Sequence, residues 1–443
     1  MDWKKFFKYF ILILGYSILA LGFSFGIIIL TGGLSPIGVL INIYLPIVAI
    51  FSFIIFPIII IILLTLNKKK KKYWILTLIF GCLVITLYIL PLGSIPYSVN
   101  QGESQFSEAF GSDYMDYIPL DLKNKFLDVP YGFWNVFHIN QNSQCNISKS
   151  CGPYLKIPIY NDSFYFDYYC PRSGSGPFPT IINIHGGAFV AGGPGITNVP
   201  EVSQYLANQG YVVIDCSYGL GKFKKNIFIN LLLGSVQFAL GEGRLNKSYT
   251  ILESTEQILA NLTDFIVKNA SELKIDTNNI FVLGRSAGAA LAGMFYGYNS
   301  TQYPIYKNWF NSTLKLKGLI LYYPPTNYTP LFYPENTNPA LSDVFFGNES
   351  LTPDLLNSLS PINLVDQCAP PTLIFHGMND GLVPHYESVR LKNRLDEVNA
   401  TSILISFPFY GHMFDLDINN PAGQISLYYL ERFLASIRYT STS

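Results

Sequence analysis

The sequence predicts an α/β fold, in which a mostly parallel central sheet has helices on both faces and is preceded by about three transmembrane helices. Two observations lead to this prediction. Uncharged apolar runs fill most of the first 97 of the 443 residues, and beyond residue 155 short apolar strands alternate with amphipathic helices. Strands of a parallel sheet are apolar throughout because crossover helices cover both faces. Only 13% of the residues are charged, about half the usual share of a globular protein.

Three N-terminal segments are long and apolar enough to cross a bilayer, which needs about 20 residues of helix. We place them in a membrane region at residues 1–97, with spans at about 9–31, 37–66 and 73–95. Pro46 and Pro57 in the long second span predict tilt or kinking. Buried core helices are rarely so free of charge, and a cleaved signal peptide would have a shorter apolar run of about 7–15 residues. Membrane spans are therefore the favoured interpretation.

Clusters of lysine set the expected orientation. Lys4, Lys5 and Lys8 precede the first span, and Lys68–Lys72 separate the second from the third. Both clusters should stay in the cytosol under the positive-inside rule. The chain beyond residue 97 would then lie in the lumen of the endoplasmic reticulum or another endomembrane, or at the cell exterior. Glycosylation sequons in that part favour the same side, at Asn146, Asn161, Asn246, Asn261, Asn269, Asn299, Asn311, Asn327, Asn348 and Asn399.

Cysteine and charge add two weaker expectations. Cys145 and Cys151 are close enough in sequence to form a small disulfide loop, whereas Cys170, Cys216 and Cys368 can be buried thiols. Beyond residue 97 the chain has 21 basic and 28 acidic residues, a net charge of −7. This balance argues against a nucleic-acid partner.

The remaining chain divides into a linker or cap segment at 98–154 and an α/β domain at 155–443. Alternation and turn residues predict two strands around a turn at Asn161-Asp162 within residues 154–169. Further strands are expected within 179–189, 211–218, 279–284, 316–323, 370–377 and 401–409, and helices within 199–210, 255–273, 387–398 and 425–436. Reactive groups of such sheets gather beyond the C-terminal ends of the strands.

One serine lies between two glycines at such a strand end. The motif GRSAG, residues 284–288, follows an apolar strand and opens a run of small helix-forming residues. A serine on a tight strand-to-helix turn adopts a strained backbone conformation, and glycines beside it relieve the crowding. The Ser286 hydroxyl would then stand exposed above the sheet, and the amide of Ala287 would face negative charge that forms nearby.

A serine becomes a nucleophile when a base takes its proton and an acid orients that base. Of the five histidines, His412 follows the last expected strand, and Asp380 follows the strand before it by a short turn. The order Ser286, Asp380, His412 is the order that this type of fold requires. These three residues are the predicted catalytic triad.

Other residues near these strand ends receive structural roles. Asp415 and Asp417 are nearer to His412 in sequence, but we expect them to cap or solvate the next helix. His376 is expected to pack or to form hydrogen bonds at its strand end.

A glycine-rich loop follows the early strand. The sequence HGGAF, residues 185–189, has little side-chain bulk at Gly186 and Gly187. Their amides, together with that of Ala287, would form an oxyanion hole, in which prepositioned N–H groups stabilise the negative carbonyl oxygen of acyl transfer. His185 is expected to brace this loop.

Residues from about 155 to 437 resemble the α/β-hydrolase superfamily. HGGAFVAGG (185–193) and GRSAGAALA (284–292) are similar to the hormone-sensitive-lipase-like carboxylesterases, a branch with membrane-anchored lumenal members. The resemblance implies a serine carboxylic-ester hydrolase of esterase or lipase type that needs no metal or cofactor and acts on a small-molecule or lipid ester. It also implies the same triad and oxyanion donors.

The chain departs from that family pattern at several points. Ala188 replaces a third glycine, DCSYGLGKF (215–223) replaces a usual Asp-Tyr-Arg run, and an apolar insert follows at 224–243. An aromatic-rich stretch, Tyr296–Phe346, lies where these folds carry a cap, and either packs the core or lines an apolar pocket. The substrate therefore stays open: isoprenylcysteine-ester and formamide hydrolases share the fold, as do non-catalytic binding or adhesion proteins.

Overall fold

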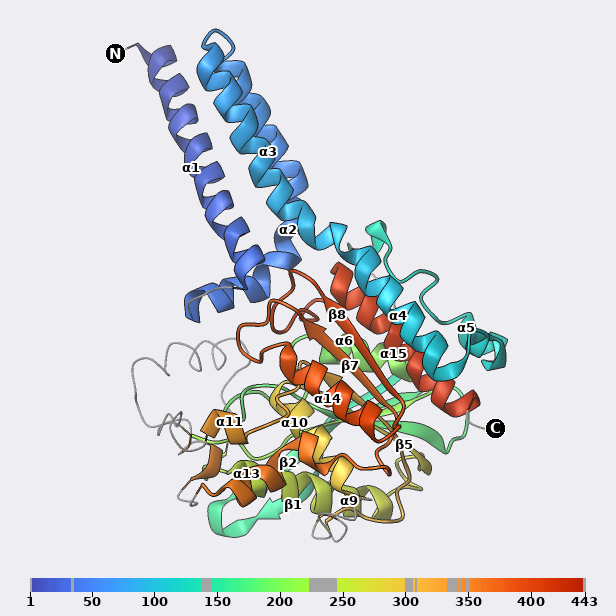
Figure 1. The fold of residues 1–443 in the computed structure, drawn as a ribbon. Helices are drawn as coiled ribbons and strands as arrows, with labels where there is room; N and C mark the ends of the chain where they lie inside the picture. The colour runs from blue at the N-terminus through green and yellow to red at the C-terminus, as the bar shows by residue number, and fades with distance from the viewer. Residues whose placement is uncertain are drawn as a thin grey trace.

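The computed structural model has three N-terminal helices that project from one end of an α/β domain (Figure 1). It describes residues 2–32, 36–136, 145–222, 245–298, 306, 309–332, 342, 345–347 and 351–440. The apolar insert at 224–243 falls wholly outside these residues, as does much of the stretch Tyr296–Phe346. Expectations about the insert therefore stay predictions.

The N-terminal helices are α1 (Trp3–Thr31), α2 (Pro36–Leu66) and α3 (Lys71–Gly93). They pack closely because glycines of α1 leave room for large apolar side chains of α2 and α3. A Cβ on Gly22 would lie 2.5 Å from the Phe56 ring, and a Cβ on Gly26 would lie 2.7 Å from Leu87. Such close approach is typical of helix pairs in membranes. By length and hydropathy α1 and the stretch Lys71–Phe110 can span a bilayer, while the described part of α2 contributes a shorter apolar helix, Ser52–Leu66.

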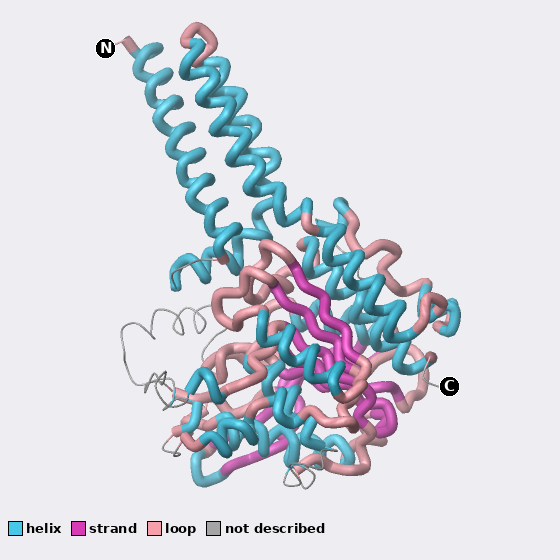
Figure 2. Tube along the Cα trace, viewed as in Figure 1, coloured by secondary structure: helices cyan, strands magenta, loops and turns pink. Residues whose placement is uncertain are grey.

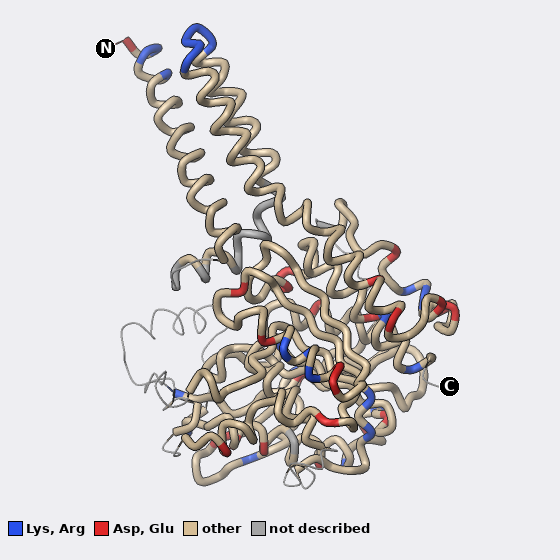
Figure 3. Tube along the Cα trace, in the orientation of Figure 1, with Lys and Arg blue, Asp and Glu red and all other residues tan. Residues whose placement is uncertain are grey.

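The outer surface of this bundle is apolar, and its charges are concentrated at one end. Phe6, Ile13 and Ile61 are among the exposed side chains. The N-terminal lysines and the Lys68–Lys72 turn lie together at the end remote from the α/β domain (Figure 3). An apolar belt with a cationic tip is the pattern of helices that cross a membrane with the lysines on one side.

A single eight-stranded sheet forms the centre of the domain, with helices on both sides (Figure 2). Its strand order is β1-β2-β4-β3-β5-β6-β7-β8. β2 pairs antiparallel with β1 and β4, and all other pairs are parallel. The strands are β1 (Cys145–Ile157), β2 (Asp162–Pro171), β3 (Phe178–Ile184), β4 (Val212–Cys216), β5 (Ile275–Arg285), β6 (Leu316–Tyr322), β7 (Thr372–Gly377) and β8 (Ser402–Phe407). The mostly parallel sheet of the predicted fold is confirmed.

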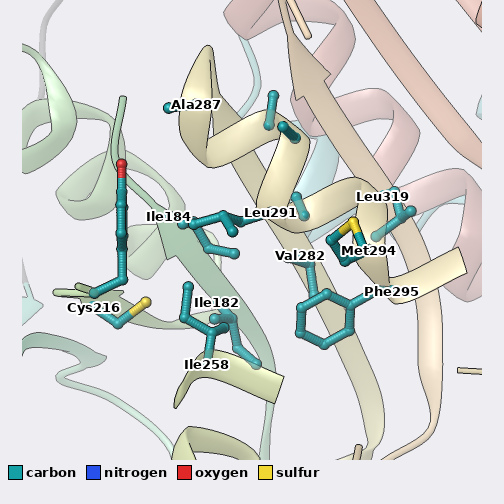
Figure 4. Packing of buried hydrophobic residues seen from close by; sticks show 14 of the residues in the cluster. Ile182, Ile184, Cys216, Ile258, Val282, Ala287, Leu291, Met294, Phe295 and Leu319 are labelled. Atoms are coloured by element: carbon teal, nitrogen blue, oxygen red, sulfur yellow. The ribbon is translucent and has the colours of Figure 1, made fainter. Parts of the chain in front are cut away.

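Alternate residues of the strands enter two different cores, because successive side chains point to opposite faces. On one face Ile182 and Val282 belong to a buried cluster with Leu291 and Phe295 (Figure 4). That face is covered by α8 (Ile251–Glu256), a π-helical turn (Gln257–Leu262), α9 (Thr263–Lys268), α10 (Ala287–Gly293), α11 (Thr329–Phe332), α13 (Pro353–Leu359) and α14 (Tyr386–Glu397). The opposite face is covered by α4 (Ile95–Phe110), α5 (Leu120–Lys123), α6 (Val199–Asn208) and α15 (Pro421–Tyr439).

Helix α4 covers the exposed edge of β8. Gln105 both donates to the Leu404 carbonyl (2.7 Å) and accepts from the Leu404 amide (2.8 Å). One and two turns earlier, Gln101 accepts from the Ser406 amide and Ser98 donates to the Ser406 carbonyl, both at 2.7 Å. Unpaired edge groups attract other strands, and these side chains satisfy them. Much of the segment 98–154, expected to be a linker or cap, thus packs on the sheet; the domain boundaries themselves stay predictions.

The suggested disulfide loop is wrong, since all six cysteines are free. Cys145 and Cys151 lie on the same strand, six positions apart. Extended chain separates them by roughly 15–20 Å, whereas a disulfide requires Cα atoms within about 7 Å. Cys170 and Cys216 are buried thiols as expected, but Cys368 is exposed.

The edge cover predicts a stability effect. Gln105→Ala removes a donor and an acceptor from Leu404, so we expect a loss of about 1–3 kcal/mol in the free energy of unfolding. Thermal unfolding of the detergent-solubilised full chain measures it. Ser104→Ala, at an exposed neighbour on the same helix, is the control. Equal melting temperatures for the two variants would contradict the edge-capping role.

Candidate active site

The turn at Ser286 joins β5 to α10 and packs closely against neighbouring backbone atoms. Ser286 has φ 53° and ψ −119°, a backbone conformation that residues with a side chain rarely adopt. A Cβ on Gly284 would lie 2.2 Å from the Gly288 carbonyl oxygen, and one on Gly288 would lie 2.2 Å from that of Ile184. The two glycines of the motif are therefore required sterically, and the turn presses against the end of β3.

Three predicted residues meet at the C-terminal ends of the strands. The Ser286 hydroxyl donates to His412 Nε2 at 2.8 Å, and His412 Nδ1–H donates to Asp380 Oδ2 at 2.6 Å. These residues come from three separate loops, and the imidazole and the carboxylate are almost fully buried. The structure thus joins serine, histidine and aspartate in one chain of hydrogen bonds.

The Asp380 carboxylate is held by more than His412. Its Oδ1 accepts from the amides of Leu382 (2.8 Å) and Val383 (2.9 Å), and His376 Nε2 lies 3.2 Å from its Oδ2. Burial acts to raise the pKa of Asp380, but the charge of His412 and the hydrogen bonds from the two histidines outweigh it, so the pKa lies below its usual range. The carboxylate therefore stays ionised near neutral pH.

His376 forms hydrogen bonds at its strand end, as expected. The Ser388 hydroxyl donates to its Nδ1 at 2.6 Å, and its Nε2–H points to the Val383 carbonyl at 2.9 Å. Its contact with Asp380 was not foreseen, because nothing in the local pattern around His376 indicates that the following turn folds back onto its ring.

The expectation for Asp415 is wrong. Asp415 is buried and does not solvate a helix: it accepts from Arg285 Nε and from the Tyr323 hydroxyl, both at 2.7 Å. Burial acts to lower the pKa of Arg285, but Asp415 keeps it above its usual value, so this is a charged pair. Arg285 stands directly before Ser286, and the Tyr323 ring centroid lies 4.4 Å from that of His412. The pair thus lies directly behind the serine and the histidine.

The same arginine continues a buried polar chain toward the neighbouring strands. Its Nη1 donates to Asn183 Oδ1 at 3.0 Å, and Asn183 Nδ2 donates to Asp215 Oδ1 at 2.7 Å. Burial raises the pKa of Asp215 to about 7, against the opposing effect of a hydrogen bond from the Gly195 amide. Sequence reasoning missed this network; the one available signal was an arginine inside an otherwise small-residue motif.

The glycine-rich loop lies beside Ser286. A Cβ on Gly186 would lie 3.4 Å from that of Ser286, and Gly187 has φ +135°. Within the described residues the Gly186 and Gly187 amides have no hydrogen-bond acceptor. The loop thus brings two free N–H groups to the side of the serine.

His185 contacts the glycine-rich loop and holds it in place. Its Nδ1–H donates to the Gly186 carbonyl at 2.8 Å, and its ring stacks on Tyr218 with centroids 4.2 Å apart. Tyr218 also donates to the His185 carbonyl at 3.0 Å. Burial lowers the pKa of His185 to about 4, so the ring is neutral at physiological pH.

A small pocket opens over the serine. Most of its lining is apolar, and its walls include Ile196, Val199, Leu382, Met413 and Leu416. The aromatic stretch Tyr296–Phe346 contributes Tyr323 to the described wall, and its other buried rings pack in the core. Within the described residues, no three His, Cys, Asp or Glu side chains gather as a metal site would require.

Comparison with known proteins supports the assignment of the fold. Residues 253–395 match the BD-FAE family model, a segment that includes Ser286 and Asp380. None of the curated proteins matches the chain in sequence. The sheet order, the serine turn and this match agree with the α/β-hydrolase fold that the sequence predicts.

Several solved structures are similar. Esterase 2 of Thermogutta terrifontis, phosphoramylated by tabun, is 17% identical over 69% of this chain and 98% of that chain, with a TM-score of 0.49. Its propionate-bound form is 18% identical over 69% and 99%, with a TM-score of 0.48. A truncated carbohydrate esterase from gut microbiota has the same values as the propionate complex.

The tight serine turn leads to a prediction. In Gly288→Ala the new Cβ would collide with β3, so we expect the turn to open and the Ser286 hydroxyl to leave His412. Covalent labelling by a fluorophosphonate should fall by at least about tenfold even in the folded fraction, since small misplacements of reacting groups are costly. Ala289→Gly, next to it in the same helix, should keep its labelling, and equal labelling of both variants would contradict the steric argument.

Proposed function

We propose that this chain is a membrane-anchored serine hydrolase that cleaves carboxylic esters through an acyl-enzyme. The observation that supports this best is the unbroken line of hydrogen bonds from Ser286 through His412 to Asp380, at 2.8 and 2.6 Å. In this proposal Ser286 is the nucleophile, His412 the general base and Asp380 the acid that orients the histidine.

In the first half-reaction the Ser286 oxygen attacks the ester carbonyl carbon while its proton moves to His412 Nε2. The ionised Asp380 stabilises the resulting imidazolium through the Nδ1 hydrogen bond. The tetrahedral intermediate then collapses, the C–O bond to the alcohol breaks, and His412 returns its proton to the leaving oxygen. An acyl group remains on Ser286.

In the second half-reaction water takes the place of the alcohol. His412 accepts a proton from the water as its oxygen attacks the acyl carbon, and then returns a proton to Ser286 as the acid leaves. In both steps the carbonyl oxygen becomes negative, and the amides of Gly186, Gly187 and Ala287 are the proposed donors to it. His185 keeps the glycine loop in place and does not itself transfer a proton.

The pocket favours a small or slender apolar acyl group. Most of its exposed lining is apolar, and Leu382, Met413 and Leu416 offer dispersion contacts to such a group. A preference for long-chain lipid esters would need surface from the insert at 224–243, which lies outside the described residues. Turnover of esters with acyl chains of increasing length therefore distinguishes a short-chain from a long-chain preference.

Membrane attachment and a lumenal or extracellular domain are part of the proposal. The apolar outer surface of the bundle favours insertion, and the lysine tip lies opposite the domain, as the positive-inside rule requires for that topology (Figure 3). Asn146, Asn161, Asn246 and Asn399 are exposed sequons that a glycosyltransferase could reach.

Labelling and turnover test the proposed chemistry. We expect a fluorophosphonate to label the full chain, and Ser286→Ala to lose labelling and at least about a thousandfold in p-nitrophenyl acetate turnover. p-Nitrophenyl esters of increasing chain length then rank the acyl preference, and a sharp preference for acetyl would rule out a long-chain lipase.

Ser173→Ala, at an exposed serine outside any sequon, is the matched control and should label normally. Labelling that survives Ser286→Ala would remove Ser286 from its role. A second outcome is a folded wild-type protein that is not labelled and does not turn over esters, isoprenylcysteine esters or formamides. That outcome would favour the alternative of a non-catalytic binding or adhesion protein.

Topology gives a separate expectation. If the domain is lumenal or extracellular, endoglycosidase treatment should shift the full-length protein to a lower apparent mass on a denaturing gel, because N-glycans are added only on that side. A protein with Asn146, Asn161, Asn246 and Asn399 replaced by glutamine serves as the control and should shift less. A wild-type band that does not move would count against the proposed topology.

A further inference from the structure

The loops that carry Asp380 and His412 touch the membrane bundle directly. Asn379, the residue before Asp380, donates from Nδ2 to the carbonyl oxygens of Ile29 (2.6 Å) and Leu30 (3.1 Å) in the last turn of α1. Carbonyl groups in the last turn of a helix have no partner within the helix. A side chain of the α/β domain therefore completes the end of α1.

A second asparagine reaches back from the bundle. Asn42 of α2 donates from Nδ2 to the Asn379 carbonyl at 3.2 Å. It also lies against Gly411, the residue before His412, where a Cβ would come within 2.4 Å of the same amide nitrogen. Asn42 is only 2% exposed. One bundle side chain thus contacts the immediate neighbours of both the acid and the base.

The fit between bundle and loops is close on the α1 side as well. Gly32 ends α1 with φ +70°, and a Cβ there would lie 2.4 Å from the Asn379 carbonyl oxygen. Phe409, in the loop between β8 and His412, packs against the apolar core of the bundle. Polar and apolar contacts therefore hold the same two loops.

The two loops also form one unit. The Asn379 amide donates to the Tyr410 carbonyl and the Met378 amide to the Phe407 carbonyl, both at 2.9 Å. A Cβ on Gly377 would lie 2.4 Å from the Tyr410 carbonyl oxygen, so the loops are in van der Waals contact. A displacement of either loop would move the other, and the separation of Asp380 and His412 depends on both.

A tether alone requires none of this. Buried amides lose hydration and are retained where their hydrogen bonds serve a geometry. We propose that the membrane bundle completes the active site: Asn379 and Asn42 are positioning residues that hold the Asp380 and His412 loops against the ends of α1 and α2. This inference rests on the proposed hydrolase function for its kinetic consequence, but the coupling between bundle and loops can be measured without it.

The experiment uses the full chain in phosphatidylcholine nanodiscs. In Asn379→Ala and Asn42→Ala the loops lose their ties to the bundle, so we expect kcat for p-nitrophenyl acetate to fall by roughly ten- to a hundredfold with little change in KM. Hydrogen exchange of the segments 378–383 and 409–416 should quicken in the same variants. Neither substitution replaces a side chain that lines the pocket, and ester binding does not depend on the separation of Asp380 and His412, which is why KM should change less than kcat.

Asn67→Ala is the matched control. Asn67 is a buried asparagine at the opposite end of α2, where it donates to the Tyr16 hydroxyl at 2.9 Å. Its replacement should lower the melting temperature of the bundle yet leave kcat and the exchange of both loops unchanged. Should Asn379→Ala fail to fold, Asn42→Ala carries the test, since it leaves the Asn379 bonds to α1 in place.

The outcomes separate the two proposals. Faster loop exchange without any wild-type turnover would support the coupling and overturn the hydrolase proposal. Active variants with unchanged kcat and unchanged exchange would overturn the coupling alone. An Asn67→Ala variant as slow as Asn42→Ala would also overturn it, because bundle stability would then explain the loss.

Discussion

The close approach of the Ser286 turn to the end of β3 is the constraint on which the rest of the site depends. Side-chain atoms at residues 284 or 288 would overlap backbone oxygens, so the turn is only as wide as two glycines allow. That contact places the serine beside the glycine loop that leaves β3. The hydroxyl and the loop amides therefore have a fixed relation before any substrate arrives, which is what electrostatic stabilisation of an oxyanion requires.

A pair of buried charged side chains lies behind this turn. Arg285 and Asp415 form a pair that is almost fully buried, and such a pair gains little net stability because desolvation offsets the attraction. The pair instead fixes positions. It holds Arg285, the residue before the serine, and Asp415 also holds Tyr323, whose ring lies beside His412. Tyr323 has φ 40°, a strained value that its hydrogen bond to Asp415 helps to hold. The arginine, which stood in the motif without an assigned role, becomes part of the support of the site.

The sequence predicted the strands, the order of serine, aspartate and histidine, and the loops on which they lie, because these depend on local periodicity and on turns at strand ends. Apart from the triad, it did not predict which distant polar groups meet. Arg285 pairs with Asp415, which is 130 positions away in the sequence. Asn379 donates to carbonyl groups at the end of α1, about 350 positions away in the sequence. A pattern of apolar residues indicates which face of an element is buried, but it does not identify the polar partner on a remote loop. For the same reason Asp415 was expected to cap or solvate a helix. The disulfide expectation failed on a local point, because the pattern did not indicate that one strand runs from Cys145 through Cys151.

The N-terminal helices and the sheet are joined by continuous structure as well as by the asparagine contacts. Only Ser94 separates α3 from α4, and α4 supplies the side chains that complete the edge of β8. The third helix of the bundle therefore leads directly into the cover of the strand that carries the His412 loop, while α1 and α2 meet that loop and its neighbour at their tips. A single flexible anchor could make neither contact. Three helices give the bundle a defined end surface, and the loops that carry Asp380 and His412 both pack against it.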